Sequence, residues 1–100
     1  MAIYVDNIHR YPTAIVNKAA KRNGYEWCHM MTDSDDIEEL HRFAKKIGMK
    51  REWFQDHESS PHYDLVPTMR KLACQHGAEQ VTAFEMAKRC SKRFKNREKA

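Results

Sequence analysis

The chain has 100 residues, of which 41% are hydrophobic and 32% are charged, and its formal net charge is +4. These values favour one small soluble domain with a single modest core over a disordered chain. No apolar stretch approaches the ~20 residues of a membrane span, and the N-terminus lacks the basic start and long apolar run of a signal peptide. We therefore expect a cytoplasmic protein without a membrane partner.

The number and spacing of cysteines and glycines argue against several familiar site motifs. The three cysteines, Cys28, Cys74 and Cys90, lie far apart, which disfavours a Cys-x-x-Cys zinc ribbon or thioredoxin-like motif. With only three separated glycines, the chain cannot form a dinucleotide fingerprint, a phosphate-binding P-loop or a Gly-x-Ser-x-Gly nucleophile elbow. Any site must therefore be built from other groups.

The N-terminal part of the chain predicts two strands. Residues 3–5 form a short β-branched and aromatic run, and Asp6 follows at its carboxyl end. Asp6 is either a capping or loop-starting aspartate, or a ligand-binding residue, because ligands gather at this end of the strands in open α/β sheets. Residues 25–31 predict the second strand. Alternation places Trp27, His29 and Met31 on one face of this strand. Cys28 and Met30 then lie on the opposite face.

Two helices are expected in the first half of the sequence. The first covers residues 13–22 and has a weak apolar face. The second covers residues 37–47, where apolar residues recur at helical spacing after a capping box formed by Asp35 and Glu38. His41 falls on the apolar face of this helix, so it is either a structural histidine with a hydrogen-bond partner or part of a polar site.

The segment that follows this helix holds aromatic and titratable residues together. Residues 53–55 predict a short strand or a core-facing loop, and a polar loop comes next. Residues 62–66 predict another strand. In that strand His62 and Asp64 point to one side and Tyr63 to the other.

The last third of the chain predicts two helices and a short strand. A helix opens at Pro67 and ends at Gly77, and residues 79–82 form the strand. Thr82 and Glu85 form a capping box that starts the last helix. The expected apolar face of that helix consists of Phe84, Ala87, Ser91 and Phe94.

Alternating strands and helices predict an α/β fold for this chain. We expect a single small domain with a short, mostly parallel sheet flanked by three or four helices. Residues 1–87 are assigned to this domain, and residues 88–100 to the basic end of the C-terminal helix and its tail.

Histidines and aspartates concentrate in the middle of the sequence. These residue types are the ligands of divalent metals and the acid–base groups of hydrolysis. A metal bound by His29, His62 and an aspartate would activate water and orient a phosphate or an amide. A metal-free site would instead use one histidine as general base, oriented by Asp64 or Asp33.

We therefore predict one pocket that binds a divalent metal ion or an anionic, nucleotide-like ligand, with hydrolysis as its chemistry. The catalytic candidates are His29, His62 and Asp64. The candidate metal ligands are His29, Asp33, His62 and Asp64. The ligand-binding candidates are Asp6, Asp33, His41, Trp53 and Tyr63. The spacing matches no strong metal signature, so structural hydrogen bonding together with exposed histidines is the alternative.

The C-terminal end of the chain is strongly basic. Residues 88–99 hold seven basic residues and one acidic residue. The candidates for polyanion binding are Lys88, Arg89, Lys92, Arg93 and Lys95. A solvated helix end whose cations complement the helix dipole explains the pattern equally well. The alternative function is thus a non-enzymatic accessory protein that binds nucleic acid or a host protein through this helix.

An ordered set of motifs covers roughly residues 2–82. The set runs Ile3-Tyr4-Val5-Asp6, Trp27-Cys28-His29-Met30, Asp33, Glu39-Leu40-His41-Arg42-Phe43-Ala44, Ile47-Gly48, Arg51-Glu52-Trp53-Phe54-Gln55, His62-Tyr63-Asp64 and Gly77-Ala78. It resembles the bacterial and phage family called domain of unknown function 4031. The resemblance implies that the recurring polar positions of the family are His29, Asp33, His41, His62, Tyr63 and Asp64. It does not choose between catalysis and binding.

Overall fold

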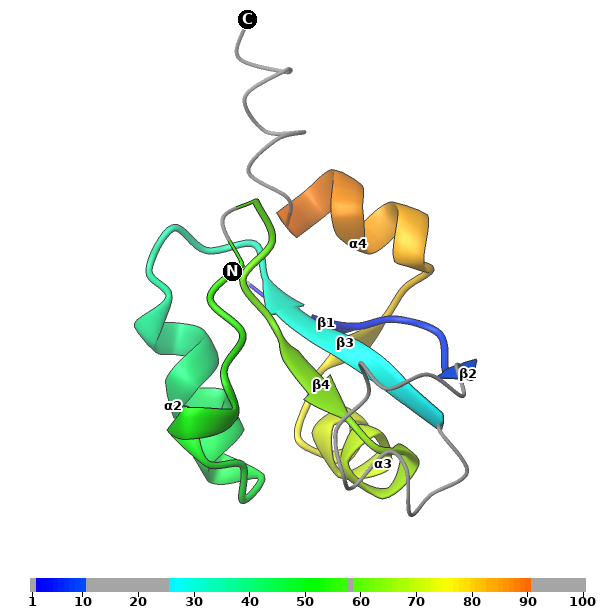
Figure 1. The fold of residues 1–100 in the computed structure, drawn as a ribbon, viewed down its shortest axis with the longest axis horizontal. Helices are drawn as coiled ribbons and strands as arrows, with labels where there is room; N and C mark the ends of the chain where they lie inside the picture. The colour runs from blue at the N-terminus through cyan, green and yellow to red at the C-terminus, as the bar shows by residue number, and fades with distance from the viewer. Residues whose placement is uncertain (1, 11–25, 58, 91–100) are drawn as a thin grey trace, which may run out of the picture.

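The computed structural model describes residues 2–10, 26–57 and 59–90 (Figure 1). The strands are β1 (Ile3–Val5), β2 (His9–Arg10), β3 (Glu26–Thr32), β4 (Tyr63–Leu65) and β5 (Glu79–Gln80). The helices are α2 (Glu38–Lys46), the short 3-10 helix η1 (Arg51–Trp53), α3 (Pro67–Gln75) and α4 (Ala83–Cys90). The helix predicted over residues 13–22 lies outside the described residues.

The long strand β3 is the centre of a five-stranded mixed sheet. It pairs antiparallel with β1, β2 and β4, and only β1 and β5 pair in parallel. The α/β class is confirmed, but the mostly parallel sheet is wrong. The connection through α2 and η1 is long enough to return the chain in either direction, so alternating elements do not fix the pairing. In the observed antiparallel register Cys28 pairs with Leu65, and both residues are fully buried.

Helices cover both faces of the sheet (Figure 1). The larger core lies on the side of α2 and α3, where Met30 and Leu65 of the sheet pack with Leu40 and Ala73 of the helices. A smaller core lies under α4. It consists of Tyr4, Met31, Met86 and Cys90. The alternation predicted for β3 is confirmed, since Cys28 and Met30 belong to the first core and Met31 to the second.

The starts of α2 and α4 differ in how well the sequence predicted them. The capping box of Asp35 and Glu38 is wrong, because Asp36 Oδ1 accepts the hydrogen bond from the Glu38 N–H at 3.1 Å. At α4 the Thr82 hydroxyl accepts from the Glu85 N–H at 3.1 Å, which is one of the two hydrogen bonds of the predicted box.

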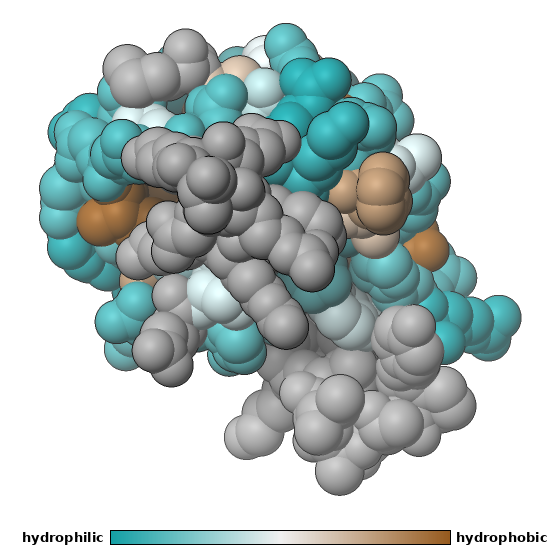
Figure 2. Space-filling view, turned by 90° about the horizontal axis from the view of Figure 1, so that it is seen from above, coloured by the Kyte–Doolittle hydropathy of each residue, from teal (hydrophilic) through white to brown (hydrophobic). Residues whose placement is uncertain are grey.

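The buried face of α4 is not the expected one. Met86 and Cys90 face the sheet, whereas Phe84 is 67% exposed. Of the expected face, Ser91 and Phe94 lie outside the described residues. Figure 2, seen from the α4 side, shows a described surface that is mostly hydrophilic with separate hydrophobic patches. None of the helices in the described ranges is long and apolar enough to cross a membrane.

Candidate metal centre

Asp6 follows the last residue of β1, at the point where the backbone hydrogen bonds between β1 and β3 end. The Asp6 N–H still donates to the His29 carbonyl at 3.3 Å. The His29 N–H, however, donates to Asp6 Oδ1 at 2.7 Å, so the carboxylate takes the place that a backbone carbonyl would have. The freed Asp6 carbonyl accepts from Arg70 Nε at 2.9 Å. Asp6 is thereby fixed with its side chain only 1% exposed.

The second carboxylate oxygen of Asp6 holds two imidazole rings. Oδ2 lies 2.8 Å from His29 Nδ1 and 3.0 Å from His9 Nε2. Burial alone would raise the pKa of Asp6, but the hydrogen bonds from His29 and His9 outweigh burial and hold the pKa below its usual value. Asp6 is therefore an ionised acceptor of ring N–H groups, and its expected role in ligand binding stays a prediction.

On the other edge of β3, His29 faces Asp64 of β4 in the strand register. His62 precedes β4, and an isolated bridge pairs it with Gln55. The rings of His62 and His29 meet edge to face with centroids 5.0 Å apart. His62 Nε2 lies 3.3 Å from Asp64 Oδ1. Asp6 just after β1, His29 of β3 and Asp64 of β4 thus form a continuous row, flanked by His62.

The hydrogen bond made by Nδ1 of His62 sets the tautomer of this ring. Its Nδ1 lies 2.8 Å from the Ser60 carbonyl oxygen, which can only accept, so Nδ1 carries a proton. Burial lowers the pKa of His62, but the neighbouring Asp64 carboxylate and the hydrogen bond to the Ser60 carbonyl outweigh burial and raise it overall. The nitrogen that faces Asp64 is therefore Nε2, which is the one available to a metal when the ring is neutral.

Asp64 contributes one oxygen with an incomplete set of partners. Its Oδ2 accepts from Gln55 Nε2 at 3.4 Å. Its Oδ1 is buried and, within the described part of the chain, makes no hydrogen bond, although His62 Nε2 is nearby. A buried carboxylate oxygen without a donor is costly. A cation placed between it and the two histidines would complete its coordination.

Two overlapping groups have ligand atoms that all lie within 4.8 Å of one another. The first is His29, His62 and Asp64, and the second is Asp6, His9 and His29. We use the term metal centre for the candidate site formed by the first group together with Asp6 and His9 behind it. It unites four residues predicted from the sequence as site residues: Asp6, His29, His62 and Asp64.

The metal centre does not include Asp33. The Asp33 carboxylate accepts from the Ala2 N–H at 2.8 Å and lies 3.2 Å from the Tyr4 hydroxyl. It follows β3 four residues after His29, roughly 13 Å further along at the rise of an extended strand. The structure therefore does not bring Asp33 together with His29, and its observed contacts tie the N-terminal strand to β3.

His41 and Tyr63 also lie apart from the metal centre, on the side of the larger core. His41 Nδ1 is 2.7 Å from the Tyr63 hydroxyl, and both rings pack on Phe54. This agrees with the structural alternative for His41, which has a buried partner. The single pocket expected to unite these residues with His62 and Asp64 is wrong, because successive residues of β4 face opposite sides.

Trp53 was expected in a strand or core-facing loop, and the structure corrects this, whereas its expected role in ligand binding stays a prediction. It lies in η1, is 47% exposed, and its ring contacts Lys50 Nζ 5.6 Å from the centroid. The aromatic residue that does flank the metal centre is Trp27. Its ring centroid lies 4.8 Å from that of His29 and 5.2 Å from that of His9.

Sequence reasoning missed four contributors to this site: His9, Gln55, Ser60 and Arg70. His9 had a usable signal, since it follows Asp6 by three residues at the end of a predicted strand. The other three act through contacts that join distant parts of the chain, such as Arg70 to Asp6 across 64 positions. No local pattern indicates such contacts.

The basic candidates are only partly described. Lys88 and Arg89 are exposed on α4. Arg89 Nη1 lies 3.4 Å from the Tyr4 hydroxyl and Nε 3.5 Å from Glu85 Oε2, so this residue serves local contacts. Lys92, Arg93 and Lys95 lie outside the described residues. Binding of a polyanion or host protein by this end stays a prediction.

Comparison with known proteins gives one match. The model of a family described as "Protein of unknown function (DUF4031)" matches residues 13–93. No curated protein and no solved structure matches the chain.

Proposed function

The chain belongs to the family of proteins of unknown function DUF4031, and we propose that it binds a divalent metal ion through His29, His62 and Asp64 and uses it for hydrolysis. One observation carries this proposal. In both histidines the nitrogen that is not offered to the metal is hydrogen-bonded to a fixed acceptor, Asp6 Oδ2 or the Ser60 carbonyl. Metal-binding histidines are held in this way almost without exception.

The donor set favours a transition metal over calcium or magnesium. Two imidazole nitrogens and one carboxylate oxygen are the ligands that Zn²⁺ and its neighbours accept, whereas Ca²⁺ and Mg²⁺ take oxygen ligands. Three protein ligands leave at least one coordination position for water or substrate. Structural zinc sites are instead closed by four protein ligands, so this arrangement resembles a catalytic site.

Asp6 acts here as the orienting residue behind His29. Its carboxylate accepts both the backbone N–H and the ring Nδ1–H of His29, which fixes the ring and leaves Nε2 for the metal. His9 donates to the same carboxylate oxygen and helps to hold it in place. Gln55 does the corresponding work at Asp64 Oδ2, so that Oδ1 points to the metal position.

A bound divalent ion would lower the pKa of a water ligand and polarise a phosphoryl or carbonyl oxygen. The residues of this chain would hold the ion and orient its ligands. Partial burial of His62 and Asp64 excludes competing water from part of the site. A phosphate ester or an amide is the substrate class that this chemistry serves.

Metal binding is tested by titrating the chelator-stripped full-length chain with ZnCl₂ in a calorimeter. We expect one ion per chain, and a loss of affinity of at least about 100-fold in His62→Ala and Asp64→Asn, because each change removes a ligand. His76→Ala is the matched control, since His76 is exposed at the end of α3. No binding by the natural chain, or equal binding by all variants, would overturn the proposal.

Hydrolysis is tested separately with p-nitrophenyl phosphate and a p-nitroanilide amide. Activity should disappear with EDTA, return with Zn²⁺ or Mn²⁺, and be absent from Asp64→Asn while His76→Ala keeps it. Tight metal binding without turnover of either substrate class would reject the hydrolytic part and leave the metal site standing.

A further inference from the structure

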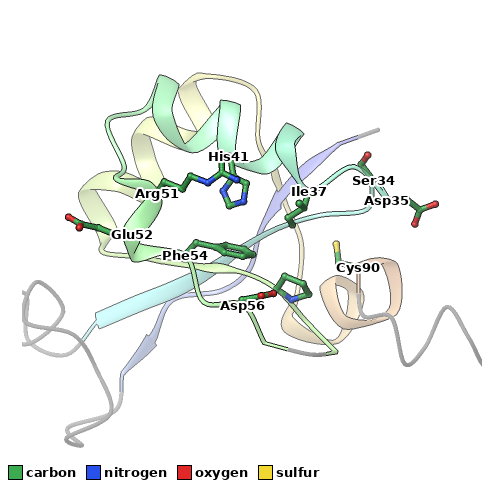
Figure 3. Close-up of a pocket in the computed structure, with 10 residues that line it drawn as sticks. Ser34, Asp35, Ile37, His41, Arg51, Glu52, Phe54, Asp56 and Cys90 are labelled. Atoms are coloured by element: carbon green, nitrogen blue, oxygen red, sulfur yellow. The ribbon is translucent and has the colours of Figure 1, made fainter.

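A hollow lies away from the metal centre, beside the start of α2. It has a volume of about 630 Å³, within the range of small-ligand sites. Ile37, Phe54 and Pro61 supply its apolar surface. Figure 3 shows Phe54 between His41 above and Asp56 below, among the residues that line this hollow. It shares no residue with the metal centre.

His41 contributes a hydrogen-bond donor to the hollow. The side chain is 8% exposed, and within the described residues its only hydrogen bond joins Nδ1 to the Tyr63 hydroxyl. Tyr63 is fully buried and its pKa is raised by burial, so its O–H stays protonated and donates to Nδ1. Burial and the nearby Arg51 lower the pKa of His41, although Glu38 and Asp56 oppose them. The neutral ring therefore carries its proton on Nε2.

The charge at the mouth of the hollow is negative. Asp35, Glu52 and Asp56 line it, against one arginine, Arg51. That guanidinium is already engaged by Glu38 in a two-point contact with N–O distances of 2.7 and 3.1 Å. An anionic ligand would meet an excess of carboxylates here, whereas a cationic one would be attracted.

We propose that this hollow binds a basic peptide that carries one aromatic or large apolar side chain. A peptide supplies the three groups that the surface requires. A backbone carbonyl accepts from the His41 Nε2–H, the apolar side chain covers Phe54 and Ile37, and lysine or arginine groups face Glu52 and Asp56. A simple polyamine would lack both the carbonyl and the apolar contact.

The test uses the full-length chain and the labelled probe acetyl-Arg-Phe-Lys-amide in fluorescence anisotropy. We expect saturable binding that is about tenfold weaker in Glu52→Gln/Asp56→Asn, since two exposed charge pairs together contribute about that much. The matched control, Glu39→Gln/Glu79→Gln, changes the net charge equally at residues that do not line the hollow. It should bind like the natural chain.

Two further measurements locate the peptide. The ¹⁵N resonance of His41 Nε2 should shift on addition of the probe, and acetyl-Arg-Ala-Lys-amide should bind more weakly because it lacks the aromatic ring. The proposal is overturned if the two double variants lose affinity equally, if His41 does not respond, or if spermidine or acetyl-Glu-Phe-Glu-amide binds as well as the probe. Metal affinity should be the same in both double variants, so this test stands apart from that of the metal centre.

Discussion

Asp6 holds His29 at two points at once, through the backbone N–H at 2.7 Å and through ring Nδ1 at 2.8 Å. A single carboxylate thus fixes both the strand position and the ring orientation of one residue. The same carboxylate also accepts from His9. This relationship makes Asp6 the most informative residue to change.

Asp6→Asn should weaken Zn²⁺ binding by about 10- to 100-fold while the chain stays folded. The asparagine amide has a similar shape to the carboxylate. In the natural chain, however, Nδ1 of His29 donates a hydrogen bond to Asp6. The amide presents an N–H group to this nitrogen instead, which favours the wrong tautomer of His29. Calorimetric titration measures the effect, and circular dichroism checks the fold. Asp33→Asn is the control, because Asp33 contacts Ala2 and Tyr4. Equal affinities for the two variants would contradict the orienting role.

Tyr63→Phe should lower the free energy of unfolding by about 1–3 kcal/mol, because it leaves His41 Nδ1 buried without its donor. Urea denaturation measures the loss. Although Tyr63 lies between His62 and Asp64 in the sequence, its side chain faces the other side of the sheet. Zn²⁺ affinity should therefore be unchanged, and a large drop would show that the two faces are not independent.

The stability contributed by His41 should depend on pH with a defined sign. Burial, aided by Arg51 and opposed by Glu38 and Asp56, lowers the folded-state pKa of His41 below 6.5. The unfolded chain therefore takes up a proton first as the pH falls below about 6.5, and the unfolding free energy decreases until the folded-state pKa is passed. The His41→Gln variant should lack this decrease, so the difference between the stability profiles of the natural chain and the variant should reveal it. The raised pKa of His62 has the opposite effect on stability as the pH falls. Because His62 is present in both the natural chain and the variant, its effect cancels in the difference. A difference that does not vary between pH 7.5 and 5 would refute the assignment.

Leu65→Ala should cost about 2–5 kcal/mol of unfolding free energy, because Leu65 is fully buried in the larger core. Phe84→Ala removes a larger side chain but should change stability by no more than about 0.5 kcal/mol, since Phe84 is mostly exposed. Thermal or urea unfolding of both variants measures the contrast. A similar loss in both would mean that α4 buries the face predicted from the sequence.

Sequence periodicity was a sound guide to strands and faces in this protein. The alternation of β3, the opposite orientation of Tyr63 and its two neighbours, and the apolar face of α2 were all predictable, because side-chain direction follows directly from the backbone repeat. For α4 the same reasoning chose the wrong stripe. Two overlapping apolar stripes were available, and packing against Tyr4 and Met31 selected Met86 and Cys90.

The candidate site was predictable as a set of residue types but not as a geometry. His29, His62 and Asp64 were identified together with Asp33, His41 and Trp53, which the structure places elsewhere. Local sequence separates residues by face but does not say which strands become neighbours. The neighbours of β3 decide that Asp6 and Asp64 lie on either side of His29.

The sequence by itself determined the α/β class, most element positions and the inward direction of His41. Only the tertiary structure decided the antiparallel pairing and the role of Asp6. The physical reason is the sequence separation over which each kind of interaction acts. Helix and strand periodicity act within a few residues, whereas a ligand set depends on contacts between residues separated by 23 positions, as in Asp6 and His29, or by more.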